Sequence, residues 1–129
     1  MRTFAAIAVL VLGAGCATLG GRSSVSNAAI AALHGGIADP HVTEKLSRAD
    51  RRKALESEYQ ALEISDAGQI VAWKGDKPGV SGQVFAGQPY TVGSQHCRQY
   101  THAININGDM ATGRGTACRN EDGSWTPLL

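Results

Sequence analysis

The 129-residue sequence lacks a strong charge of either sign and any apolar run long enough to cross a bilayer. Its 12 Lys and Arg residues nearly balance its 11 Asp and Glu residues, and the net charge is +1. Proteins that bind nucleic acid usually carry a marked basic patch, which this balance does not supply. The longest apolar run, residues 4–12, is far shorter than the ~20 residues of a membrane-spanning helix. We therefore expect no nucleic-acid partner and no spanning helix.

Residue patterns that carry catalysis or bind metal are also missing. The sequence has no Cys-x-x-Cys motif and no pair of His residues at metal-ligand spacing. His96 and Cys97 are neighbours on a predicted strand, so their side chains point to opposite faces and cannot act as base and nucleophile. Gly113-Arg114-Gly115 lies in a strand pattern, where we interpret the glycines as places where an aromatic side chain or a helix approaches the sheet. We expect no enzyme activity, no catalytic residue, no metal and no cofactor.

The N-terminus, MRTFAAIAVLVLGAGC, has the order of a lipoprotein signal peptide. A basic residue, an apolar core and a small-residue cleavage site follow one another and end at Cys16. Gly-Ala-Gly-Cys resembles a lipobox, although Gly13 stands where Leu is preferred. Ala17, in place of Asp, favours sorting to the outer membrane. We predict a signal peptide over 1–15 and a lipid on Cys16 that attaches the protein to the membrane.

The region 16–45 is predicted to be a lipidated N-terminus, a tether and a short apolar segment. Residues 17–27 are small and polar and read as a flexible tether. Residues 28–38 are apolar and rich in Ala and Gly. This stretch is either a short helix on the domain or an element that inserts into the membrane or self-associates.

The region 46–129 is predicted to be one α+β domain. Residues 47–63 form its helix, with a capping start at Ser47 and Asp50. An apolar stripe of Leu55, Tyr59 and Leu62 faces the sheet. Basic and acidic residues interleave on this helix and around it, and we interpret them as a solvated face with local ion pairs. The acidic members are Glu44, Asp50, Glu56 and Glu58.

Beyond residue 69 the hydrophobic period becomes twofold, which predicts short strands near 69–74, 80–86, 95–106, 109–118 and 124–127. Tight turns join them, so the helix should pack on a four- to five-stranded antiparallel meander. Trp73 and Trp125 are either stacking platforms for a ligand or core residues, and the scarcity of aromatics favours the core.

Asn107-Gly108 is the strongest hairpin signal in the chain. A two-residue turn at this point places Cys97 directly opposite Cys118, in a register that suits a disulfide. Tyr100 then stands opposite Gly115 on the other face, which leaves room for the helix. With Cys16 lipidated, this pairing also accounts for all three cysteines.

Several segments together resemble the rickettsial 17 kDa surface antigen family of bacterial outer-membrane lipoproteins. They are DRRKALESEYQALE, the strand with Trp73, PGVSGQVFAG, HCRQY and GRGTACRNEDGSW, and they cover about residues 46–128. The two Cys-Arg pairs, at 97–98 and 118–119, are the most specific part. The resemblance implies an outer-membrane lipoprotein, facing the surface or the periplasm, without catalysis.

We therefore expect a structural or envelope-associated protein, anchored through Cys16, with a protein or polysaccharide partner. The alternative is a periplasmic binding module that inhibits an envelope-degrading enzyme such as lysozyme. An exposed loop with a Ser or His that could enter a catalytic cleft would favour this alternative.

Overall fold

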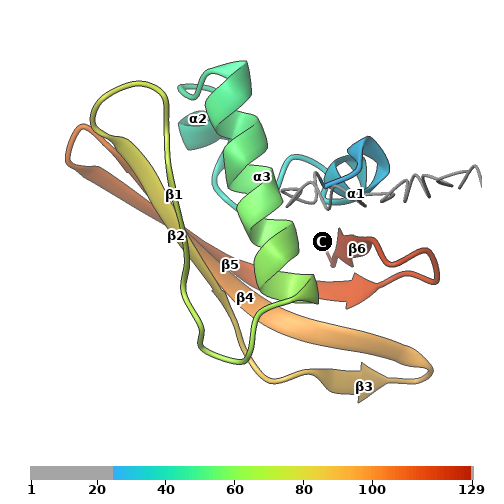
Figure 1. Ribbon diagram of the computed structural model, residues 1–129. Helices are drawn as coiled ribbons and strands as arrows, with labels where there is room; N and C mark the ends of the chain where they lie inside the picture. Colours follow the sequence, from blue (N-terminus) through green and yellow to red (C-terminus); the bar gives the residue numbers. More distant parts are fainter. Residues whose placement is uncertain (1–24, 129) are drawn as a thin grey trace, which may run out of the picture.

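The computed structural model describes residues 25–128, and it places three helices and six strands in this range (Figure 1). The helices are α1 (Asn27–Ala32), α2 (Pro40–Thr43) and α3 (Arg48–Glu63). The strands are β1 (Val71–Lys74), β2 (Val80–Ala86), β3 (Tyr90–Val92), β4 (Gln95–Ile106), β5 (Asp109–Arg119) and β6 (Trp125–Pro127). The predicted signal peptide, the lipidation site at Cys16 and most of the predicted tether lie outside the described residues.

The strands form one antiparallel sheet in the order β1-β2-β4-β5-β6, and β3 also pairs with β4. β2 and β3 lie one after the other along the same edge of β4, because Ala86 pairs with Tyr100 and Tyr90 with Cys97. Between them Pro89 has no N–H to donate to a ladder, which breaks the pairing. The α+β class and the antiparallel meander are confirmed. The expected single helix and four to five strands are corrected to three helices and six strands within residues 25–128.

The Asn107-Gly108 turn sets the register of the two longest strands. Both residues have positive φ, 53° and 92°, as a type I′ turn requires. From Ile106–Asp109 to Cys97–Cys118, ten successive pairs of β4 and β5 stand directly opposite each other. No bulge interrupts this ladder, and the register predicted from the turn is confirmed.

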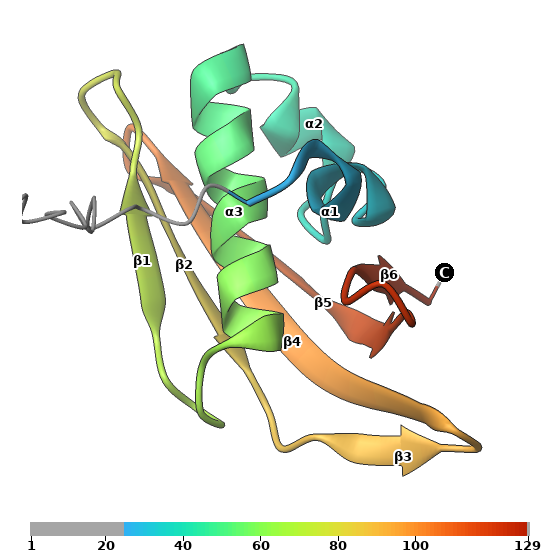
Figure 2. The same ribbon diagram turned by 45° about the vertical axis from the view of Figure 1, so that its right-hand side comes forward.

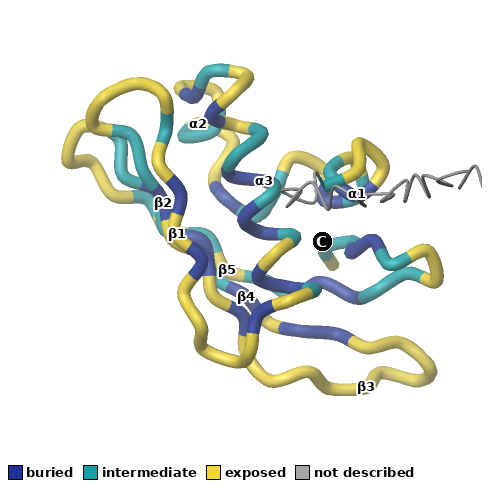
Figure 3. The backbone as a smooth tube through the Cα atoms, viewed as in Figure 1, coloured by how far each residue is buried: buried dark blue, intermediate teal, exposed yellow. Residues whose placement is uncertain are grey.

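Helix α3 lies across one face of the sheet and buries the predicted stripe. Ser47 caps its start, where the hydroxyl accepts a hydrogen bond from the Asp50 backbone N–H at 3.1 Å. Leu55 and Leu62 are buried in the larger of two hydrophobic clusters of the domain, here called the main core. Tyr59 is partly exposed and packs against this core. Figure 3 shows that the buried positions of α3 and of the central strands face one another.

All three helices lie on the same side of the sheet, as the two views in Figures 1 and 2 agree. Leu33, just after α1, is fully buried in the main core. Gly113 and Gly115 make room for residues 37–38, since a Cβ at Gly113 would stand 2.3 Å from the Ile37 carbonyl oxygen. The segment 28–38 is therefore a short helix and loop packed on the domain. The packed unit therefore begins before residue 46, the predicted start of the α+β domain.

Within residues 25–128, no helix has the length and apolar character needed to cross a membrane.

Candidate functional site

In each of the two Cys-Arg pairs, the Cys and the Arg point to opposite faces of the sheet. Cys97 and Cys118 stand opposite each other on β4 and β5 and are joined by a disulfide, with their Cα atoms 4.0 Å apart. Neighbouring residues on a strand point to opposite faces. Arg98 and Arg119 therefore point toward α3, and each binds the C-terminal end of that helix.

Arg98 satisfies backbone carbonyls that the end of α3 leaves unpaired. Its Nη1 donates to the carbonyl oxygens of Ala61, Leu62 and Ser65 at 3.1, 2.9 and 2.9 Å, and its Nε donates to Gly87 at 2.9 Å. A cation is favourable at this end of a helix because the dipole is negative there. Burial lowers the pKa of Arg98, yet a guanidinium stays protonated in a protein. Arg98 is 4% exposed, so it joins the end of α3 to the sheet from inside the protein.

Arg119 forms a second contact with the same helix end. Its Nε and Nη2 donate to the two carboxylate oxygens of Glu63 at 2.9 and 3.0 Å, and Trp125 Nε1 donates to the same carboxylate at 2.7 Å. The hydrogen bonds from Arg119 are the main reason that the pKa of Glu63 is lowered. This fork-to-fork geometry fixes the orientation of both partners.

A chain of buried hydrogen bonds connects the middle of α3 to the sheet. Trp73 Nε1 donates to His102 Nε2 at 2.9 Å, and His102 Nδ1 lies 2.7 Å from Glu58 Oε2. An indole N–H is only a donor, so Nε2 is the acceptor and the imidazole is the neutral tautomer with its proton on Nδ1. The Ile37 backbone N–H also donates to the Glu58 carboxylate, at 3.2 Å. Glu58 thus joins α3, β4 and the α1–α2 loop.

Two acidic side chains are therefore not where the sequence interpretation placed them. Asp50 and Glu58 were assigned to a solvated helix face, but they are 0% and 1% exposed. Asp50 Oδ1 accepts a hydrogen bond from the Asp76 backbone N–H at 2.7 Å, which ties the start of α3 to the β1–β2 turn. Buried carboxylates persist where donors satisfy them, as they do for Glu58 and for Asp50 Oδ1, whereas Asp50 Oδ2 has no hydrogen-bond partner within residues 25–128. Glu44 and Arg48 follow the interpretation and are exposed.

Tyr100 lies close to the same buried chain. It is 3% exposed, and its hydroxyl has no hydrogen-bond partner within residues 25–128. Burial, reinforced by the negative Glu58, raises the pKa of Tyr100. The phenol therefore stays protonated and cannot serve as a base at neutral pH.

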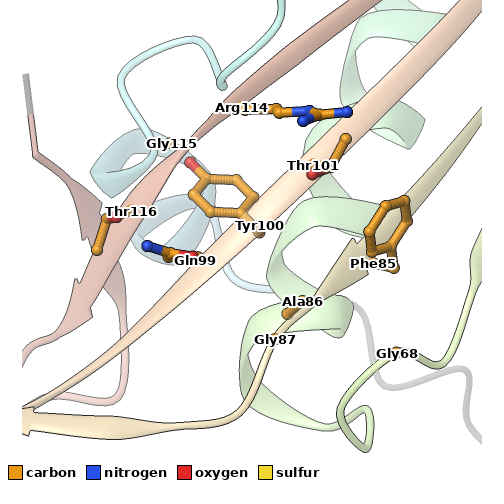
Figure 4. Close-up of a pocket in the computed structure, with 10 residues that line it drawn as sticks. All are labelled: Gly68, Phe85, Ala86, Gly87, Gln99, Tyr100, Thr101, Arg114, Gly115 and Thr116. Carbon is orange, nitrogen blue, oxygen red and sulfur yellow. The ribbon is translucent and has the colours of Figure 1, made fainter.

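The face of the sheet that points away from the helices, here called the outer face, is open. Phe85, Thr101 and Arg114 form one row across β2, β4 and β5, and Figure 4 shows these side chains on neighbouring strands. Gln99 and Thr116 form the next row. A hollow of about 550 Å³ lies at these two rows, and we call it the Arg114 pocket. Its volume falls within the range of small-molecule sites.

Comparison with known proteins identifies the family. Residues 60–126, just over half of the chain, match the family described as 17 kDa outer membrane surface antigen. The chain belongs to the 17 kDa outer membrane surface antigen family. The 17 kDa surface antigen of Rickettsia bellii is 35% identical over 77 residues, and those of Rickettsia conorii and Rickettsia rickettsii are 36% identical over 77 residues. In each case the alignment covers 59% of this chain and 48% of the relative. No solved structure matches the chain.

The chain thus spans about half the length of these surface antigens, and the matched part holds both Cys-Arg pairs. The family range begins inside α3 and ends in β6. It includes Arg98, Arg119 and the Arg114 pocket, whereas Glu58 lies just before it. The resemblance seen in the sequence is confirmed, and membership of a family described as outer membrane surface antigen indicates the cell envelope surface.

The remaining candidate residues from the sequence fall into two groups. Trp73 and Trp125 are buried, 7% and 3% exposed, so the core interpretation is confirmed. His34, His41 and His96 are exposed, and only His102 joins other functional groups. Within residues 25–128 no group of three or more His, Cys, Asp or Glu side chains is placed to hold a metal ion. Sequence reasoning missed the Glu58–His102 pair because its partners are 44 residues apart.

Proposed function

We propose that this surface antigen family member is an outer-membrane lipoprotein, attached through a lipid on Cys16, whose domain has a structural or binding role without catalysis. The attachment is supported by the lipoprotein-type N-terminus that ends at Cys16. A single acyl chain holds a protein on a membrane only weakly, whereas two or more chains hold it stably. A diacylated Cys16 would therefore be a sufficient anchor.

The observation that carries the non-catalytic role is how the polar side chains are used. Arg98, Asp50 and the Glu58–His102 pair all hold α3 on the sheet and are buried beneath it. Side chains that are buried and hydrogen-bonded within the fold are not available to a substrate. The outer face carries accessible polar side chains, among them Gln99, Thr101 and Arg114, and these suit binding rather than bond cleavage.

Metabolic labelling with palmitate and membrane fractionation test the anchor. Wild-type protein should be labelled and should sediment with outer membranes, whereas Cys16→Ala should be unlabelled. Ala17→Asp is the matched control for sorting, because it should keep the label and remain in the inner membrane. A wild-type protein that is unlabelled and soluble would refute the anchor.

An inhibitor of an envelope-degrading enzyme is the second candidate, and one observation favours it. β3 and the start of β4 form an arm whose outer end is exposed, as Figure 3 shows. Ser94 lies at its turn and His96 directly after it, both exposed. This is the kind of loop that can enter a catalytic cleft.

A lysozyme assay tests this second candidate. If the arm inhibits, full-length protein in micromolar excess should slow lysis of bacterial cell walls, and Ser94→Ala together with His96→Ala should relieve the inhibition. Ser81→Ala, on the opposite part of the sheet, is the control. Unchanged lysozyme activity with wild-type protein would remove the candidate.

A further inference from the structure

We infer that the Arg114 pocket and the outer face around it bind a carboxylate-bearing oligosaccharide. This inference deepens the proposed binding role at the envelope and rests on it. It starts from Arg114, which lies midway along β5 on the outer face and is exposed. Within residues 25–128 this guanidinium forms no hydrogen bond and no ion pair.

Arg114 differs in this respect from the other two arginines of the sheet. Arg98 and Arg119 point to the helix face and are both held by the end of α3. Arg114 points the other way and has all of its donors available. A planar guanidinium is best matched by a carboxylate, which it can bind through two parallel hydrogen bonds.

The charge on the outer face is complementary to an anion. No acidic side chain lines the Arg114 pocket or the second hollow on the same face, which has a volume of about 310 Å³. The second hollow adds another cation, Lys74. A phosphate is usually bound by several cations or by free backbone N–H groups. Arg114 is the one cation among the described residues that line the Arg114 pocket, so one singly charged carboxylate fits better than a phosphate.

The neutral residues around Arg114 fit a sugar. Gln99, Thr101 and Thr116 supply an amide and two hydroxyls, which can donate to and accept from sugar hydroxyls. Phe85 is 40% exposed beside Thr101 and offers an apolar ring for the C–H face of a sugar. Directly opposite side chains on a sheet lie only about 4.5–5.5 Å apart, so one sugar ring can touch two neighbouring side chains of a row.

The length of the site favours an oligosaccharide over a single sugar. The two hollows extend along β4 from Gln99 to Asn105. The six residue steps from Gln99 to Asn105 span about 20 Å in an antiparallel strand. A peptide is recognised on a sheet mainly by pairing with an edge strand, which here would place it along the unpaired edge of β5 before Ala117 and not over the two hollows of the outer face.

The test measures binding by the full-length chain in detergent. The probes are a short oligogalacturonate, its methyl ester and a polyglutamate peptide. The oligogalacturonate should bind, and Arg114→Gln should weaken its binding about tenfold or more, which is the size of one charge-assisted contact. Arg114→Lys should give an intermediate loss, since it keeps the charge but not the fork. Arg48→Gln, the same change at an exposed helix residue, should leave binding unchanged. Unchanged thermal unfolding of each variant shows that the fold is intact.

Each other outcome overturns the inference in a defined way. Absent oligogalacturonate binding, or equal binding by wild type and Arg114→Gln, removes the site. Equal binding of the methyl ester would show that the site does not recognise the carboxylate. Equal or tighter binding of polyglutamate would show that the ligand is an acidic peptide and not a sugar. None of these results affects membrane attachment through Cys16, which the labelling experiment tests separately.

Discussion

Removal of the Glu58 carboxylate should destabilise the domain far more than removal of an exposed acid on the same helix. In Glu58→Ala, the His102 Nδ1–H and the Ile37 N–H lose their acceptor inside the protein. Each buried donor left unpaired costs about 1–3 kcal/mol, so the free energy of unfolding should fall by about 2–6 kcal/mol. For a domain of about 100 residues, 1 kcal/mol corresponds to roughly 4–8 °C in Tm.

Glu56 provides the matched control on α3. It forms a half-exposed ion pair with Arg52, four residues away, at 2.9 Å. Pairs of this kind contribute about 0–1 kcal/mol, so Glu56→Ala should change stability little. Glu58→Gln should fall between the two, because the amide oxygen can accept from one of the two donors. Denaturant unfolding of all three variants with the disulfide intact measures the differences. A loss for Glu58→Ala within about 1 kcal/mol of that for Glu56→Ala would refute the role of the buried chain.

Three further predictions concern packing and pH. Leu62→Ala should lower the free energy of unfolding by about 2–5 kcal/mol, whereas Ile64→Ala, at a residue 66% exposed, should leave it nearly unchanged in the same denaturant titration. Gly113→Ala should displace the Ile37 loop and expose residues 25–45 to protease, while Gly87→Ala, whose Cβ would lie 3.7 Å from its nearest neighbour, should not. The pKa of Glu63 is lowered in the folded state, so its stabilising effect is present above pH 4.5 and is lost as the pH falls. The Tm of Glu63→Gln should therefore lie below that of wild type at pH 7, and the two should converge in acid. A constant difference across that pH range would contradict this role of Glu63.

The sequence was most informative where structure is decided locally. The Asn107-Gly108 turn determines its own geometry and, through pairing, the position of every residue back to Cys97. Ser47 caps α3 through a contact only three residues along the chain. Apolar spacing in α3 likewise identified Leu55 and Leu62 as core residues, because a helix brings every third or fourth residue to one face.

The sequence was uninformative where burial depends on distant partners. Asp50 and Glu58 look like surface acids because their donors, at Asp76 and His102, come from other parts of the chain. Helices of four and six residues, like α2 and α1, are too short to show a period and gain their stability from tertiary packing. The glycines of β5 were recognised as a place of close approach, but the approaching group is the Ile37 loop instead of an aromatic side chain or α3.

If Cys16 carries the proposed lipid, the packing of the N-terminal segment limits how far the domain can move from the membrane. The domain is held from residue 25 onward, where the Val25 carbonyl oxygen accepts a hydrogen bond from Arg52 Nη2 at 2.9 Å. Only nine peptide units separate Val25 from the proposed anchor at Cys16. Even fully extended, such a chain spans about 30 Å, which is the thickness of the hydrocarbon core of a bilayer. An anchored domain would therefore stay beside the lipid surface, and it would meet partners that come within that short radius of the outer membrane.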